Sequence, residues 1–184
     1  MSPARQASSP PVLGGDVLSF LEALNTGGAQ RLEVARTALG TQLEGLVTNK
    51  VLRVLDGLLG PVVALGPVAF KILGVPVSMV RASGATDQVA LRDAIILAHS
   101  RGFRVLDVFS KYVALRDQQG REHLLYIRIS DGTPNTSTVG LLLKKHKPTL
   151  QRGRGTLILY TLDPAKYKFQ QKFRPELQVW EAVQ

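Results

Sequence analysis

Two helical blocks joined at a glycine, in residues 31–59, constrain the fold more than any other part of the chain. In the first block Leu32, Ala35 and Leu39 recur at steps of three and four residues, which places them on one face of a helix. Gly40 suits the sharp turn that follows, because glycine reaches left-handed backbone angles without a steric penalty. The second block, residues 42–59, continues the helical spacing for about four turns. Its apolar residues are Leu43, Val47, Val51, Val54, Leu55 and Leu58.

The segments on either side of these blocks are shorter. Residues 16–24 form a helical pattern that begins at Asp16, a residue type that caps free amides of a first helical turn. After residue 59, Gly60 and Pro61 end the second block. Three valine-rich runs separated by Gly and Pro then predict strands of a small antiparallel ribbon. These runs are residues 62–65, 68–73 and 77–81.

The order helix, helix, helix, ribbon makes residues 16–80 resemble the winged helix-turn-helix DNA-binding domains of bacterial regulators. In this resemblance residues 31–39 match the second helix, 42–59 the recognition helix and 62–80 the wing. The resemblance implies that an exposed helix face contacts base edges, for which amide and hydroxyl side chains are suited. The residues predicted for this role are Gln42, Thr48 and Asn49. Lys50, Arg53 and Lys71 are predicted to contact phosphates.

The second half of the chain predicts a different arrangement. Residues 82–85 are expected to be a linker, and Thr86 to cap a helix over 87–101. Strands are expected at 103–109, 112–116, 123–129 and 156–161, with a turn at 117–120 and a helix at 139–147. The predicted class is therefore α+β, with a winged-helix-like domain over 13–81 and an α/β domain over 86–184. The second domain is expected to hold a mixed sheet of about four strands, and the Ser- and Pro-rich residues 1–12 to be a disordered tail.

Residues 86–162 resemble the restriction-endonuclease-like, PD-(D/E)XK superfamily in their order of helix, three strands, helix and strand. That family needs an acidic residue near the second strand and an acidic-X-lysine set on the third, because carboxylates hold a divalent metal ion. The third strand here has Tyr126 and Arg128 at the positions of interest, and tyrosine does not replace a carboxylate as a magnesium ligand. We therefore predict a catalytically silent domain with no catalytic residue, metal or cofactor. A metal-dependent nuclease using Asp107, Asp117 and Glu122 remains the alternative.

Positive charge is concentrated at the C-terminal end. Nine of the 23 Lys and Arg residues fall within 144–184, against three of the 14 Asp and Glu residues. Such an excess favours a polyanionic partner, and cations bind phosphates by displacing counterions. The predicted phosphate contacts in this region are Lys144, Lys145, Lys147, Arg152, Arg154, Lys166, Lys168, Lys172 and Arg174. Tyr167, Phe169 and Phe173 are interleaved with them and are predicted either to stack on unpaired bases or to pin the tail to the core.

Composition narrows the remaining classes of function. The chain has no cysteine, which excludes disulfides and thiol nucleophiles. The most apolar region, 51–80, is interrupted by Gly-Pro pairs and charges, so no transmembrane helix and no integral membrane association are expected. No export signal is recognised, and we expect a cytoplasmic, nucleoid-associated protein whose partner is duplex or single-stranded DNA. A homodimer, and a membrane-surface or protein-interaction role for residues 58–80 with the basic tail, are left open.

Overall fold

The computed structural model describes residues 14–109, 111–127, 129 and 135–182, so the predicted tail at 1–12 lies outside the described residues. The fold is α+β, with a three-stranded antiparallel sheet and a five-stranded mixed sheet. The chain divides into two compact units, described separately below. The first holds the described residues up to 54 together with 63–80. The second holds 55–62 and the described residues from 81 onward.

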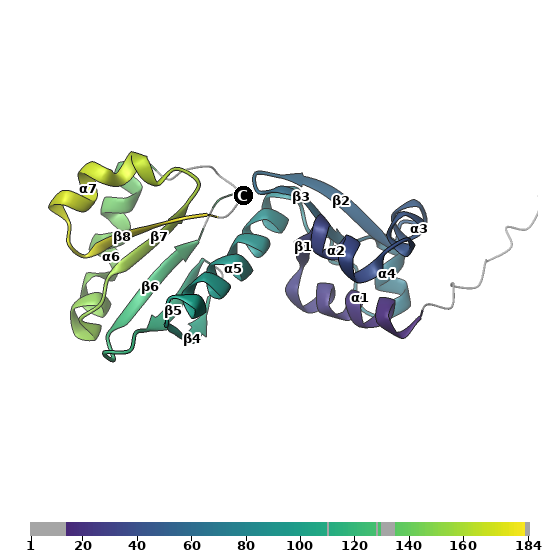
Figure 1. The fold of residues 1–184 in the computed structure, drawn as a ribbon, viewed down its shortest axis with the longest axis horizontal. Coiled ribbons are helices and arrows are strands. Elements are labelled where there is room, and N and C mark those ends of the chain that lie inside the picture. Colours follow the sequence, from purple (N-terminus) through teal and green to yellow (C-terminus); the bar gives the residue numbers. More distant parts are fainter. Residues whose placement is uncertain (1–13, 110, 128, 130–134, 183–184) are drawn as a thin grey trace, which may run out of the picture. The chain divides into compact units, whose positions relative to one another are not determined.

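The first unit packs short helices against a small sheet (Figure 1). Its core joins Leu21 of the first helix, Leu39 and Leu43 around the Gly40 turn, and Val63 and Phe70 from the segment that follows. The three strands lie in the order β1-β3-β2. The elements that contribute to this unit are α1 (Gly15–Gly27), β1 (Ala29–Arg31), α2 (Leu32–Leu39), α3 (Gln42–Thr48), β2 (Leu52–Gly57), β3 (Gly60–Leu65) and α4 (Pro67–Leu73).

The predicted helix over 42–59 is wrong in its second half. The helix α3 ends at Thr48, and β2 occupies Leu52–Gly57. The chain reverses at Lys50, whose φ of 58° is left-handed, and the amide of Val51 donates to the carbonyl of Leu46. Val54 and Leu55, which were assigned to the helix, belong to this strand instead, and the β-branched Val54 suits it.

The predicted ribbon over 62–81 is also displaced. The antiparallel hairpin is β2–β3, and residues 68–73 lie in the helix α4. Gly66 precedes that helix, Pro67 opens it, and Gly74 ends it with a left-handed φ of 66°. Proline at the first position and glycine after the last are preferred ends of a helix, and here they override the strand preference of valine. Lys71 therefore lies on α4 and not in a wing, and residues 77–81 form no strand.

Gly45 offers a direct test of α3. A Cβ on Gly45 would have no atom within 4 Å, and its backbone needs no positive φ, so Gly45→Ala should raise the free energy of unfolding by about 1 kcal/mol. Gly40→Ala is the matched control. It also has open space around the new Cβ, but its φ of +54° should make it destabilising by a similar amount. Urea denaturation of both variants measures the difference, and a destabilised Gly45→Ala protein would contradict a helical Gly45.

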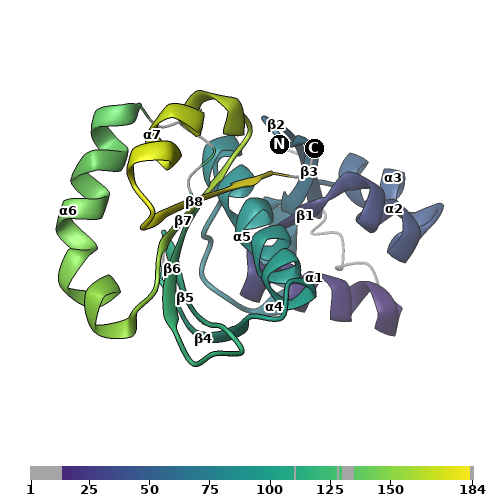
Figure 2. The same ribbon diagram turned by 60° about the vertical axis from the view of Figure 1, so that its left-hand side comes forward.

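The second unit is a five-stranded sheet in the order β4-β5-β6-β7-β8. The pairs β4–β5 and β5–β6 are antiparallel, whereas β6–β7 and β7–β8 are parallel. Figure 2 shows α5 on one face of this sheet, with α6 and α7 on the other. The elements are α5 (Ala82–Ser100), β4 (Arg104–Val108), β5 (Tyr112–Arg116), β6 (Glu122–Ile127), α6 (Thr136–Gly153), β7 (Leu157–Thr161), the 3-10 helix η1 (Pro164–Tyr167), α7 (Lys168–Phe173) and β8 (Leu177–Glu181).

The sequence predicted most of this unit correctly. The four expected strands and the helix within α6 are confirmed, although α6 extends past Pro148 to Gly153. The expected linker at 82–85 is wrong, because these residues form the first turn of α5. A fifth strand, β8, was not predicted. It lies beside β7, which is buried along its whole length because helices cover both faces of the sheet.

Candidate nucleic-acid interface

The helix α6 carries buried leucines and exposed lysines. Leu143 and Leu150 are buried in the core between α6 and the sheet. Lys144 and Lys147, at positions one and four residues after Leu143, are exposed. The helix begins where the Asn135 side chain accepts a hydrogen bond from the amide of Thr138 at 2.8 Å. Lys147, four residues after Leu143 and three before Leu150, therefore lies on the same helix face as the two leucines, where that face meets solvent, and Lys144 lies beside it.

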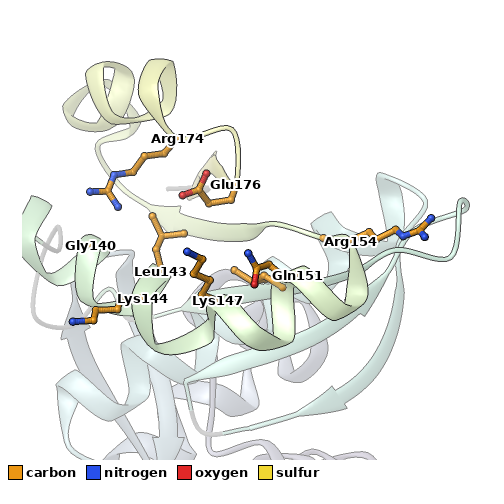
Figure 3. A pocket seen from close by; sticks show the side chains of 10 residues that line it. Gly140, Leu143, Lys144, Lys147, Gln151, Arg154, Arg174 and Glu176 are labelled. Atoms are coloured by element: carbon orange, nitrogen blue, oxygen red, sulfur yellow. The ribbon is translucent and has the colours of Figure 1, made fainter.

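A hollow of about 600 Å³, which we call the central hollow, lies between α6 and the segment that leads into β8. Figure 3 shows Arg174 and Glu176 on the β8 side and Lys147 on the α6 side, with Arg154 at the far end of the helix. The guanidinium of Arg174 lies close to α6, since a Cβ on Gly140 would be 3.9 Å from Arg174 Nη2. The lining residues are Gly140, Leu143, Lys144, Lys147, Leu150, Gln151, Arg154, Gly155, Arg174 and Glu176.

A second hollow of about 620 Å³, the turn hollow, lies between the β5–β6 turn and the end of α6. Arg154 lines both this hollow and the central one. The full lining is Gln119, Gly120, Arg121, Glu122, Arg152, Gly153 and Arg154.

Two glycines bring the end of α6 against the start of β6. A Cβ on Gly153 would lie 2.7 Å from Glu122 Cβ, and one on Gly155 only 1.7 Å from the carbonyl oxygen of Glu122. Gly155 therefore has to be glycine for the backbones to approach this closely. The alternation Arg-Gly-Arg-Gly at 152–155 thus uses its glycines for packing, and both Arg152 and Arg154 are exposed.

A buried histidine ties the β5–β6 turn to the same loop. The amide of Thr156 donates to His123 Nδ1 at 3.2 Å, so His123 Nε2 carries the proton and donates to Asp117 Oδ2, also at 3.2 Å. Asp117 additionally accepts from the amide and the side chain of Arg121. Burial alone would raise the pKa of Asp117, but these hydrogen bonds outweigh it and lower the pKa to about 2. The carboxylate is therefore a structural anchor for the turn that forms one wall of the turn hollow.

A third hollow of about 470 Å³, the aromatic hollow, lies between α7 and the start of α6. Phe169 and Phe173 line it, with 74% and 64% of their surface exposed and their ring centres 4.8 Å apart. Gln170 holds α7 in place by donating from Nε2 to the Thr136 carbonyl at 3.1 Å. The lining is Thr136, Lys166, Phe169, Gln170, Phe173 and Arg174. Arg174 lines both this hollow and the central hollow.

The three hollows therefore follow one another, joined by Arg154 and Arg174, and we call the whole the basic groove. Five of its cations have no carboxylate partner within the part of the chain that the structure describes; they are Lys144, Lys147, Arg152, Arg154 and Arg174. Of its two acidic residues, Glu122 is paired with Arg116. The groove is thus a concentrated positive surface.

Several predicted phosphate contacts meet in this groove and others do not. Lys144, Lys147, Arg152, Arg154, Lys166 and Arg174 line it. Lys145, Lys168 and Lys172 are exposed but line none of the three hollows. The sequence did not predict that Arg121, Gln151 and Gln170 also line the groove. Arg121 lies in the β5–β6 turn, far from the basic tail in sequence, and nothing in the sequence shows that α6 ends beside that turn.

Tyr167 was predicted either to stack on unpaired bases or to pin the tail to the core; the first prediction is wrong and the second is confirmed. The side chain is fully buried in the core with Leu157 and Leu177. Burial, with contributions from Asp163 and Tyr126, raises the pKa of its phenol to about 12, although a hydrogen bond with Thr161 acts in the opposite direction. Tyr167 therefore pins η1 to the sheet. Of the three aromatic residues, only Phe169 and Phe173 remain available for stacking on bases.

The raised pKa of Tyr167 predicts a loss of stability at alkaline pH. Between about pH 10, the ordinary tyrosine pKa, and about pH 12, the unfolded chain loses the phenol proton while the folded protein retains it. The free energy of unfolding should therefore fall as the pH rises through this window. Urea titrations at pH 9 and at about pH 11.5 measure the fall. Tyr167→Phe should show a smaller fall than the wild-type protein, and an equal fall in both would contradict the assignment.

The first unit presents its predicted base contacts on the surface. Gln42 and Thr48 on α3, and Asn49 and Lys50 just after it, are all exposed. Arg53, which was predicted to contact phosphate, makes hydrogen bonds within the first unit instead. Its Nε donates to the Leu65 carbonyl at 3.2 Å and its Nη2 to the Val80 carbonyl at 2.8 Å, so its guanidinium is used within the fold.

The three carboxylates of the nuclease alternative do not converge. Asp107 lies at an exposed irregularity of the edge strand β4, Asp117 is engaged by Arg121 and His123, and Glu122 pairs with Arg116. Tyr126 is buried, with its ring centre 5.2 Å from that of Tyr112. Among the described residues no group of three or more His, Asp or Glu side chains could hold a metal ion.

None of the helices within the described ranges is long and apolar enough to cross a bilayer. The apolar segments of the first unit are instead divided among β2, β3 and α4. Comparisons of the chain with protein-family models, with curated proteins and with solved structures find no match.

Proposed function

We propose that the protein binds DNA through the basic groove and catalyses no reaction on it. The observation that carries this proposal is that Arg154 and Arg174 each line two of the three hollows. Lys144 and Lys147 lie between them along α6, without carboxylate partners in the described residues. A row of unpaired cations along a hollow suits a chain of phosphates better than a single small anion.

The backbone at Arg154 supports the same proposal. Its φ of 52° and ψ of 30° are left-handed, at a position after a helix where glycine is usual. A residue with a side chain costs about 1 kcal/mol in this conformation. Strain of this kind in a residue that joins two hollows is explained if its guanidinium contacts a ligand.

The proposal includes a second DNA contact, through the first unit acting as a winged helix. The element order α1-β1-α2-α3-β2-β3 supports it, with α3 as the recognition helix and the β2–β3 hairpin as the wing. In this role Gln42, Thr48 and Asn49 would contact base edges, and Lys50 and Lys71 phosphates. The order α5-β4-β5-β6-α6-β7 likewise supports a restriction-endonuclease-like fold in the second unit, with Tyr126 on β6 where that family needs a carboxylate. Association with a bacterial nucleoid would follow from DNA binding.

Salt dependence tests the proposal. If Lys144, Lys147, Arg152, Arg154 and Arg174 each neutralise one phosphate, log affinity should fall with log salt with a slope of about −3.5 on single strands and −4.5 on duplex. Fluorescence anisotropy of labelled DNA with the full-length protein, between about 0.05 and 0.2 M salt, measures the slope. Absence of binding, or a slope near zero, would overturn the proposal.

A further inference from the structure

We propose that the occupant of the basic groove is a single strand of DNA, with unpaired bases against Phe169 and Phe173 and the backbone running past Arg174, Lys147 and Arg154. This inference rests on the proposed function and names the form of DNA that the groove takes. The inference rests on the aromatic hollow, because binding of phosphates by the cations does not require the two exposed phenylalanines.

Phe169 and Phe173 are not part of the core cluster between α6 and the sheet. The helix α7 buries none of its residues, whereas Tyr167 and Leu177 on either side of it are buried in the core. Phe169 and Phe173 are one helical turn apart, so they lie on the same face of α7. Two large apolar rings held in water at the edge of a hollow are a stacking platform for planar groups.

The neighbouring cations favour nucleotides among planar groups. Arg174 lines the aromatic hollow together with both phenylalanines and also lines the central hollow. Lys172 Nζ lies 5.9 Å from the ring centre of Phe173. A ligand that stacks on the rings therefore has positive charge beside it, and the central hollow continues that charge along α6. Alternating aromatic and cationic contacts match the alternation of base and phosphate in a nucleic acid strand.

A single strand fits this arrangement better than a duplex. The bases of a duplex are stacked on one another, so their faces are not available to a protein side chain, whereas those of a single strand are. The central hollow also contains one carboxylate, Glu176, among four cations. A carboxylate opposes phosphate binding but can accept a hydrogen bond from the exocyclic amino group of a base.

The test compares a single strand of about 16 nucleotides with the duplex of the same sequence. The variant is Phe169→Ala with Phe173→Ala, and the matched control is Ile96→Ala, an equally exposed apolar residue on α5 that lines none of the three hollows. Each ring that stacks should contribute about 5- to 150-fold to single-strand affinity. The double variant should therefore lose at least about 25-fold on the single strand and less than about threefold on the duplex.

The outcomes separate the inference from the proposed function. If the double variant binds the single strand as the wild type does, and binding still depends on salt, the single-strand inference is overturned but the proposed DNA binding is not. An equal loss on single strand and duplex would also overturn it. No binding of either form by the wild-type protein would overturn both.

A fluorescent base provides an independent readout. With 2-aminopurine within the single strand, stacking on Phe169 or Phe173 should change the emission when wild-type protein binds. At protein concentrations that saturate the strand, the double phenylalanine variant should leave that change absent and Ile96→Ala should retain it. The same change in all three proteins would show that the bases stack elsewhere and would overturn the inference.

Discussion

Replacing Lys147, Arg154 and Arg174 together by alanine should weaken DNA binding by about 100- to 1,000-fold at about 0.1 M salt. Each of these cations lines the central hollow, and none has a carboxylate partner in the described ranges of the chain. Displacing one counterion contributes on the order of tenfold in affinity at this salt concentration. The slope of log affinity against log salt should also become shallower by about 2 to 3.

A charge-matched control separates the effect of the groove on DNA binding from the effect of net charge. Arg81, Arg104 and Lys111 are exposed and line none of the three hollows, so their triple alanine variant removes the same charge elsewhere in the second unit. It should lose less than about tenfold through the weaker overall field. Equal losses in the two triple variants would show that DNA responds to net charge and has no preferred path over α6.

The second large effect is on stability. Gly155→Ala should lower the free energy of unfolding by on the order of 3 kcal/mol, since its Cβ would lie 1.7 Å from the Glu122 carbonyl oxygen and 2.4 Å from the carbonyl carbon. No rotamer relieves a clash between a Cβ and backbone. The loop must move away from β6, and the hydrogen bonds from Leu124 to Thr156 and from Thr156 to His123 are lost with it.

Gly140→Ala is the control for this prediction. Gly140 lies within α6, and a Cβ there would meet only Arg174 Nη2 at 3.9 Å, an ordinary contact. Alanine in a helix interior should stabilise the protein by about 0.5 to 1 kcal/mol. Urea denaturation of both variants gives the comparison. A Gly155→Ala protein as stable as the wild type would contradict the close approach of the two backbones.

The fold was predictable where local pattern and tertiary packing agree. The hairpin β5–β6 has alternating strands and a Gly120 turn, and α6 has leucines at helical spacing, so both were correct. Prediction failed after Thr48, where Val54 and Leu55 continue the helical spacing but belong to the strand β2. The reversal depends on Lys50 in a left-handed conformation with Gly66 packed on its carbonyl, and a residue so far along the chain leaves no mark in the local sequence.

The groove was predictable in its chemistry but not in its construction. The nine cations of residues 144–184 predicted a concentrated positive surface, and six of them line the groove. The sequence did not show that Tyr167 is buried while Phe169 is exposed, because both are aromatic residues in the same basic segment and only the packing of η1 against the sheet separates them. Nor did it show that the β5–β6 turn, with Arg121, meets the end of α6. That meeting requires Gly155 to pack on the backbone of Glu122 and His123, and Thr156 to donate to His123.

Lysine acetylation with and without DNA tests most directly whether the basic groove is the binding surface. Full-length protein is treated with an acetylating reagent, alone and saturated with a single strand, and each lysine is quantified by mass spectrometry. Lys144 and Lys147 in the groove should be protected severalfold by DNA, whereas Lys111, exposed outside the three hollows, should react equally in both samples. Full reactivity of Lys144 and Lys147 in the saturated complex would contradict a DNA path over α6.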